Sequence, residues 1–281
     1  MNEMNIHDLE VLSWDLRQNT LDIIMAGGGG HIGGDMSLMN TLLVLYENHL
    51  NISPETVDDP GRDRFVLSKG HSMEAYYAVL CHKGFLDLAD VTARFSKFGS
   101  PYIGHPNNKL PGIEMNSGSL GHGLPVCVGM ALAGKRSGKS YRVYTVMGDG
   151  ELAEGSVWEG AMAAGHYKLD NLCAVVDRNK LQISGTTEEV MSHEPLGQRF
   201  ASFGWNVLDV NGDSIPELDS AFTQAKECRG KPTVIIANTT KGYGSPLMEN
   251  KAGWHHHLPT PEECEQIKFD FAKGKEAALN G

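Results

Sequence analysis

The segment Arg142-Val-Tyr-Thr-Val-Met-Gly-Asp-Gly150 carries a run of β-branched, aromatic and apolar residues that ends at an acidic residue between two glycines. A second apolar run, residues 172–177, follows a helical stretch and leads into Asp177-Arg-Asn-Lys180. A strand, a helix and a strand in this order form a right-handed β-α-β unit, whose two strands are parallel. Asp149 and Asn179, 30 positions apart, therefore emerge at the carboxyl edge, where such sheets bind ligands.

The alternation of strand-like and helix-like segments extends in both directions from this unit. Apolar runs predict strands at residues 64–68, 142–147, 172–177, 205–210 and 233–238. Helical spacing of apolar residues predicts helices at residues 6–26, 37–50, 73–83, 154–167, 196–203 and 215–227. This alternation predicts an α/β fold, a parallel sheet with helices on both faces. We expect one domain over residues 1–281, with a C-terminal tail after about Pro259.

Composition excludes several classes of protein. The 281 residues are 41% hydrophobic, and the formal net charge is −11, without a block of five or six Lys or Arg that could follow a phosphate backbone. Nucleic acid is therefore not an expected partner. No run of 18 apolar residues occurs and the N-terminal segment is polar, so we expect no membrane association and a cytoplasmic location. The five cysteines are odd in number and far apart, which predicts free thiols.

The Gly148-Asp149-Gly150 motif has a chemical interpretation. A carboxylate from Asp149 and an amide oxygen from Asn179 suit a hard cation such as Mg²⁺, which is held by one or two protein oxygens, water and the phosphates of its ligand. The flanking glycines let the backbone approach a diphosphate, and the following helix offers amide donors. The alternative is an ordinary turn in which Gly and Asp only supply unusual backbone angles.

Four histidines lie in glycine-rich loops instead of on apolar faces: His31, His71, His105 and His255. Residues 97–123 form the longest such loop, and loops of this kind usually carry function. An imidazole titrates near neutral pH and can move a proton to or from a sugar hydroxyl. For each histidine taken alone, a solvated or hydrogen-bonded side chain is the competing interpretation.

Two further patterns suggest other kinds of site, a dinucleotide site and a histidine metal site, but both match their motifs poorly. Gly28-Gly-Gly-His-Ile-Gly33 matches a dinucleotide-binding fingerprint, but it follows a helical pattern and lacks the acidic residue that should close a second strand. His255-His-His257 lacks the spacing that directs two ligands to one metal ion. We expect His256 and His257 to lie in a solvated loop.

Taken together, the motifs resemble the amino-terminal half of transketolase, a thiamine diphosphate-dependent enzyme. They occur in the family's order: Gly30-His-Ile-Gly33, Leu67-Ser-Lys-Gly-His71, Gly104-His-Pro106, Ser117-Gly-Ser-Leu-Gly-His-Gly123, Gly148-Asp-Gly-Glu-Leu-Ala-Glu-Gly155, Lys241-Gly-Tyr-Gly-Ser245 and Gly253-Trp-His255. The resemblance covers most of the chain and implies a diphosphate-binding (PP-type) domain.

The resemblance also implies roles for individual residues. Asp149, Asn179 and the main-chain carbonyl of Leu181 would bind Mg²⁺, for which Ca²⁺ or Mn²⁺ can substitute. The residues that would contact thiamine diphosphate are His71, Gly118, Leu120, Gly148, Gly150, Glu154, Asn179 and His255. The catalytic residues that face the substrate would be His31, His105 and His255. In the family, the acid at the position of Glu154 lies at the interface with a pyrimidine-binding domain, and Glu159 is a further, weaker correspondence.

The resemblance implies a two-subunit enzyme. Transketolases also have a pyrimidine-binding domain, which carries the glutamate that activates the aminopyrimidine ring, and a C-terminal domain; neither is present in this sequence. We therefore expect the amino-terminal subunit of a split transketolase, in an α2β2 assembly with a separately encoded chain, that transfers a two-carbon ketol unit from a ketose to an aldose. The alternatives are the α-subunit of a 2-oxo acid dehydrogenase and a non-catalytic interaction module.

Four positions depart from the common family pattern, and they leave the sugars open. These are Ile32, Ser119, His122 and Trp254. Whether the sugars are phosphorylated, sulfonated or deoxy does not follow from the residues.

Overall fold

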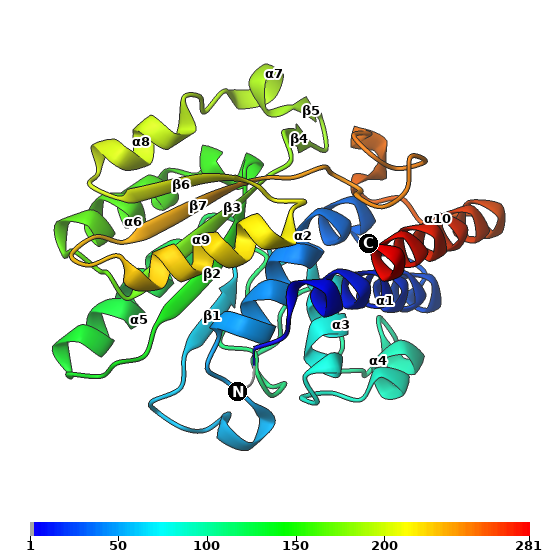
Figure 1. The fold of residues 1–281 in the computed structure, drawn as a ribbon, viewed down its shortest axis with the longest axis horizontal. Helices are drawn as coiled ribbons and strands as arrows, with labels where there is room; N and C mark the ends of the chain where they lie inside the picture. Colours follow the sequence, from blue (N-terminus) through cyan, green and yellow to red (C-terminus); the bar gives the residue numbers. More distant parts are fainter. Residues whose placement is uncertain (1–2) are drawn as a thin grey trace.

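A five-stranded sheet forms the centre of the protein, whose computed structural model describes residues 3–281. All neighbouring strands are parallel, in the order β1-β2-β3-β7-β6 (Figure 1). The strands are β1 (Arg64–Leu67), β2 (Val143–Gly148), β3 (Leu172–Arg178), β6 (Asn206–Asn211) and β7 (Thr233–Asn238). A separate short hairpin consists of β4 (Leu181–Gln182) and β5 (Gly185–Thr186). The predicted α/β class and all five predicted strands are confirmed.

Helices cover both faces of the sheet (Figure 1). In chain order they are α1 (Ile6–Gly27), α2 (Ile32–Val44), α3 (Met73–His82), α4 (Leu88–Arg94), α5 (Gly123–Arg136), α6 (Gly155–His166), α7 (Thr187–Met191), α8 (Leu196–Ser202), α9 (Ile215–Glu227) and α10 (Pro261–Asn280). Short helical turns occur at Leu45–His49, Pro54–Thr56, Gly150–Ala153 and Ala252–His255. The six predicted helices are present.

Side-chain alternation along the strands divides the core into two layers. Phe65 and Leu67 of β1 point into one layer with α1, α2, α3 and α9, whereas Val66 points into the other with α5, α6 and α8. In β2, Tyr144 points into the first layer and Val143 into the second. Because successive side chains in a strand face opposite sides, a sheet buried on both faces requires continuous apolar strands.

Two predicted boundaries were wrong. The second helix begins at Ile32 instead of residue 37, because Gly33 and Gly34 belong to its first turn. A Cβ atom on Gly33 would lie 2.7 Å from the carbonyl oxygen of Trp254, and one on Gly34 would lie 2.9 Å from Ser72 Oγ. These glycines therefore allow close packing at the start of α2.

The predicted C-terminal tail is also wrong, because residues 261–280 form helix α10, which packs along α1 (Figure 1). The sequence pattern did not predict α4, α5, α7 or the β4–β5 hairpin. The predicted free thiols are confirmed, since all five cysteines are unpaired. Within residues 3–281, no helix combines the length and the apolar character needed to cross a membrane.

Candidate active site

The predicted metal ligands meet at the carboxyl edge of the sheet. Asp149 follows β2 and Asn179 follows β3, and the register pairs Gly148 with Asp177. Both side chains are buried. The amide of Gly150 donates to Asp149 Oδ1 at 2.8 Å. Burial, together with the nearby charge of Asp177, raises the pKa of Asp149 to about 6.

A cavity of about 340 Å³ opens at this edge. The sequence-predicted residues that line it are His31, His71, Gly118, Leu120, Gly148, Asp149, Gly150, Asn179, Leu181 and His255. Ten of the predicted positions, from six separate segments of the chain, therefore converge on one space.

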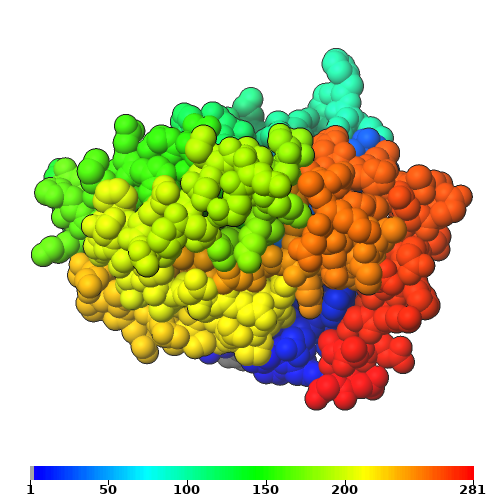
Figure 2. All heavy atoms as spheres, turned by 90° about the horizontal axis from the view of Figure 1, so that it is seen from above, coloured from blue at the N-terminus to red at the C-terminus, as the bar shows by residue number. Residues whose placement is uncertain are grey.

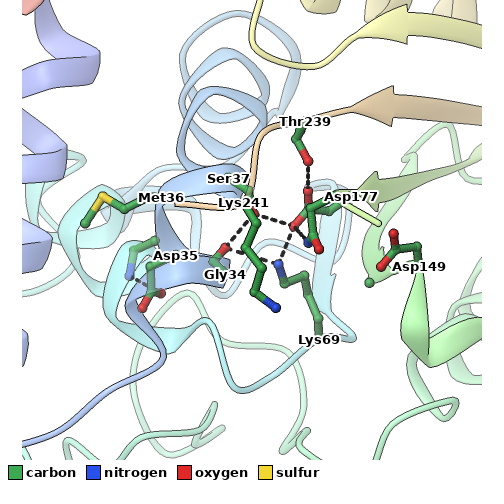
Figure 3. A network of polar contacts seen from close by, with 12 residues as sticks. Gly34, Asp35, Met36, Ser37, Lys69, Asp149, Asp177, Thr239 and Lys241 are labelled. Carbon is green, nitrogen blue, oxygen red and sulfur yellow. Dashed lines mark hydrogen bonds and ion pairs between the residues drawn. The ribbon is translucent and has the colours of Figure 1, made fainter. Parts of the chain in front are cut away.

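Asp177 organises a buried polar network that includes Lys69, a residue of the cavity lining (Figure 3). Its carboxylate accepts hydrogen bonds from Ser37 Oγ at 2.8 Å and from Thr239 Oγ1, and it pairs with Lys69 Nζ. Burial alone would raise the pKa of Asp177, but the Lys69 ammonium and these hydrogen bonds hold it below its ordinary value. Lys69 also donates to the carbonyl of Gly34 at 3.1 Å, which connects β1, α2 and β3.

Lys241 occupies the opposite wall and contacts two predicted site residues. Its Nζ donates to the carbonyl oxygen of Leu181 at 3.0 Å and contacts Nδ1 of His255 at 2.9 Å. Burial lowers the pKa of Lys241 to about 8, and the charge of Lys69 contributes. The Leu181 carbonyl is therefore directed toward the cavity, where it accepts a hydrogen bond from Lys241. Figure 2 shows the segments that carry Leu181 and Lys241 side by side on one face of the molecule.

His31 lies at the centre of a histidine cluster. Its ring centroid is 5.2 Å from that of His71, 5.4 Å from that of His255 and 6.2 Å from that of His105. Burial and the neighbouring imidazoles lower the pKa of His31 to about 4, and burial with the charge of Lys241 lowers that of His255 to about 3. Both rings are therefore neutral at pH 7 and can accept a proton or donate a hydrogen bond.

His256 is the histidine whose position differs most from expectation. Its ring centroid lies 4.7 Å from that of His31, so it belongs to the cluster, although its side chain is exposed. His257 packs on Trp254 and pairs with Glu263 at 2.8 Å. His257 therefore departs from the expected solvated state, whereas His256 is exposed as expected and differs only in lying beside His31. No sequence signal distinguished His256, because adjacent histidines differ only in the direction of their side chains.

Close packing explains two of the predicted glycines. Gly118 has a φ of 134°, and a Cβ atom there would lie 2.6 Å from the ring of His105. A Cβ atom on Gly150 would lie 2.8 Å from Cγ of Gln182. Gln182 Nε2 is buried and has no hydrogen-bond partner within residues 3–281, although the residue lines the cavity. An unused buried donor at this place suits an anionic ligand.

Three predicted residues lie outside the lining of the cavity. His105 stacks against its rim beside Gly118, whereas Glu154 and Glu159 are exposed on and just before α6. The prediction of Glu154 as a cofactor contact therefore finds no support in this chain. The buried acid is instead Glu151, which accepts hydrogen bonds from the amides of Gly121 at 2.8 Å and Gly148 at 3.1 Å.

The polar groups that line the cavity fit a metal-bound diphosphate. The cavity combines a carboxylate, an amide oxygen and a main-chain carbonyl, which suit a hard cation, with two ammonium groups and an unpartnered amide donor, which suit phosphate oxygens. Glycines at its wall keep it open to a ligand.

Comparison with known proteins identifies the family. The family model described as the transketolase thiamine diphosphate-binding domain matches residues 11–276. The chain belongs to the transketolase family. An apulose-4-phosphate transketolase subunit from Phocaeicola vulgatus is 48% identical over 263 residues, which cover 94% of this chain and 93% of that protein. The 6-deoxy-6-sulfo-D-fructose transketolase subunit SqwG from a Clostridium species is 40% identical over 274 residues, or 97% and 99% of the two chains.

The solved transketolase structures agree with this result. A crystal structure of the transketolase from Campylobacter jejuni superposes with a TM-score of 0.90 at 31% identity, covering 98% of this chain and 46% of that one. The predicted membership of the transketolase family and the diphosphate-binding fold are therefore confirmed. The relatives named as subunits have nearly the same length as this chain, which favours a transketolase subunit over the 2-oxo acid dehydrogenase and interaction-module alternatives.

Proposed function

We propose that this chain is the diphosphate-binding subunit of a two-subunit transketolase, which transfers a two-carbon ketol unit from a ketose to an aldose. The observation that carries the proposal is the convergence on one cavity of the Asp149, Asn179 and Leu181 oxygens with the histidine cluster around His31. The family match and the names of the relatives support it.

In this proposal the chain binds thiamine diphosphate through Mg²⁺. Asp149, Asn179 and the Leu181 carbonyl hold the metal, while Lys69 and Lys241 compensate the charge of the diphosphate. When bound, thiamine diphosphate supplies the electron sink that allows the bond next to the ketose carbonyl to break. The protein supplies orientation and proton transfer.

The hydrogen bond between Lys241 and His255 separates the roles of the two central histidines. Because an ammonium group can only donate, Nδ1 of His255 accepts, and the hydrogen of the neutral ring is on Nε2. His255 therefore donates a hydrogen bond to a sugar oxygen. His31 also lines the cavity, and within residues 3–281 its neutral ring makes no such contact with a cation, so we assign to His31 the removal of the proton from the C3 hydroxyl. His105, at the rim, holds the C1 hydroxyl of the donor.

The proposed partner is a separately encoded chain with the pyrimidine-binding and C-terminal domains, and the proposed assembly is α2β2. The two relatives bear names with different substrates, apulose 4-phosphate and 6-deoxy-6-sulfofructose. Both substrates carry a terminal anionic group, a phosphate or a sulfonate. We propose a ketose with such a group as the substrate class of this chain.

Reconstitution tests this function. The chain is purified alone and together with a candidate partner of about 300 residues, and ketol transfer is measured with phosphorylated and sulfonated ketoses. We expect activity only in the presence of the partner, because the activating glutamate belongs to the other chain. Activity of this chain alone, freed of host transketolase, would contradict the split-enzyme proposal.

A further inference from the structure

Two buried acids lie directly behind the histidine cluster. Asp35 is in the first turn of α2, whose N-cap residue is His31. Glu74 is in the first turn of α3, which begins two residues after His71. The side chains of Asp35 and Glu74 are 0% and 1% exposed, and neither lines the cofactor cavity.

The contacts of the two carboxyl groups join the starts of these helices. Asp35 Oδ1 accepts a hydrogen bond from the amide of Ala75 at 3.0 Å. Glu74 Oε1 packs against the backbone before His31, where a Cβ atom on Gly30 would lie 2.7 Å from it. The remaining oxygens, Asp35 Oδ2 and Glu74 Oε2, find no donor within residues 3–281. Because Ala75 directly follows Glu74 in α3, its hydrogen bond to Asp35 fixes the Asp35 carboxyl group at the start of α3, beside Glu74.

The surroundings do not provide enough positive charge for two carboxylates. The titratable groups that face the pair are Lys69, on the side of Asp35, and Tyr77, on the side of Glu74, while His31 contacts Glu74 through its backbone. Lys69 is already paired with Asp177, and the cluster histidines are neutral at pH 7. Burial, followed by the repulsion between the two groups, raises the pKa of Glu74, and burial raises that of Asp35. Two adjacent acids in such a site cannot both ionise.

We propose that Asp35 and Glu74 share one proton in a carboxyl–carboxylate hydrogen bond, and that this bond positions the His31 and His71 loops against each other. The shared proton satisfies the two oxygens that otherwise lack a donor, and each helix N-terminus stabilises the remaining negative charge. Asp35 and Glu74 are positioning residues, since neither reaches the cavity. The effect on catalysis rests on the proposed function, whereas the shared proton itself does not.

Infrared spectroscopy tests the shared proton without any assay of activity. The full chain at pH 7 should show the carbonyl stretch of a buried protonated carboxyl, and this band should disappear in Glu74→Gln and in Asp35→Asn. The exposed residue Glu276 on α10 provides the control, because Glu276→Gln should leave the band unchanged. The proposal would be overturned if the difference spectra between wild type and each variant contain no band of a protonated carboxyl group.

The pH dependence of unfolding gives a second measurement. The folded pair keeps a proton that the unfolded chain releases near pH 4, so the folded state binds more protons above that pH. The pair should therefore lower the equilibrium constant for folding by about 10-fold per pH unit until it loses its proton, in addition to the pH dependence that other groups contribute. Glu74→Gln should flatten this dependence by that amount, since its amide cannot ionise. An identical slope in wild type and Glu74→Gln would overturn the proposal even if the variant folds poorly.

Kinetics of the assembled enzyme then test positioning. Glu74→Ala should lower kcat by about 10²-fold through misplacement of the histidines, with KM little changed. Glu74→Gln should recover most of that loss, because the amide donates as the protonated acid does, and should remove any fall in kcat at alkaline pH. Equal kcat values in Glu74→Ala and wild type would contradict the positioning role. If no variant, including wild type, transfers ketol units, the proposed function fails while the spectroscopic result stands.

Discussion

At the scale of single residues, the proposed metal site depends on oxygens that two neighbouring strands bring to one edge. Asp149 is 5% exposed and Asn179 is 7% exposed, so surrounding residues hold both side chains in place. The Asp149 carboxylate already accepts backbone hydrogen bonds from Gly150 and Lys180, which fix its orientation before any ligand arrives. Because the carboxylate is oriented in advance, a mutation of Asp149 should affect the binding of the ligand more than the folding of the chain.

We predict that Asp149→Ala and Asn179→Ala each remove Mg²⁺-dependent binding of thiamine diphosphate at concentrations that saturate the wild-type assembly. Each substitution deletes an oxygen ligand of a hard cation. Cofactor-induced circular dichroism in the assembled complex measures binding. Glu265→Ala, at an exposed position on α10, is the control and should titrate like wild type. Normal titration of both site variants would show that the metal ligands are assigned wrongly.

The two central histidines should respond differently to removal. His31→Ala should lower kcat by about 10²–10⁴-fold, the range for loss of a positioned general base. His255→Ala should lower it by roughly 10–10²-fold, because it loses a hydrogen-bond donor. Steady-state kinetics with saturating cofactor separate these effects from binding. A larger loss in His255→Ala than in His31→Ala would reverse the assignment of the base.

Only part of the site could be predicted from the sequence. Asp149, Asn179 and the four loop histidines stand out because glycines surround them in recognisable motifs. Lys69 and Lys241 lie in the same motifs but were not identified, since a lysine beside a glycine is usually solvated. Their roles arise from partners more than ten positions away, such as Asp177, 108 positions from Lys69, and His255, 14 positions from Lys241. Asp35 and Glu74 give no local signal at all, because only the packing of α2 against α3 brings them together.

At the scale of elements, helix α10 shows where periodicity failed. Thr260 caps the helix through the amide of Glu263, and a proline occupies the first turn, both of which are standard start signals. The helix was nevertheless predicted as a tail, because few apolar residues mark its buried face: Cys264, Ile267 and Phe271. That face packs on α1, where Trp14 lies 6.1 Å from Phe271, ring to ring. Parallel strands were predictable because each is a continuous apolar run, whereas a helix with so narrow an apolar stripe resembles a polar tail.

The packing of α10 can be tested by its two phenylalanines. Phe271 is 2% exposed and Phe269 is 54% exposed. Phe271→Ala should lower the free energy of unfolding by about 3–5 kcal/mol, the usual cost of deleting a buried aromatic ring. Phe269→Ala should change it by less than about 1 kcal/mol, since it loses only a contact with Lys273. Urea unfolding of the full chain measures both, and equal effects would show that α10 is not anchored through Phe271.

At the scale of the whole molecule, the surface next to the cavity indicates where the partner chain could bind. If the partner binds at Glu154, we expect an exposed apolar surface there that includes Trp158. The Trp158 ring instead packs on Phe200, and its Nε1 donates to the Leu152 carbonyl at 2.8 Å. The exposed apolar side chains of this region are instead Val126 on α5 and Met162 on α6, which are 38% and 55% exposed. These two helices pack on each other and adjoin the loop that carries Asp149.

We predict that Met162→Glu weakens the complex with the partner chain without unfolding this one. A carboxylate at this exposed position should change the free energy of unfolding by less than about 0.5 kcal/mol. The same charge in an obligate interface loses its hydration and should lower the yield of co-purified partner. Phe269→Glu, on α10 and equally exposed, is the matched control, and its complex should form normally. If Met162→Glu binds the partner as wild type does while Phe269→Glu does not, the partner covers α10 and not the α5–α6 surface. In that case the exposed Glu154 would not belong to the interface either.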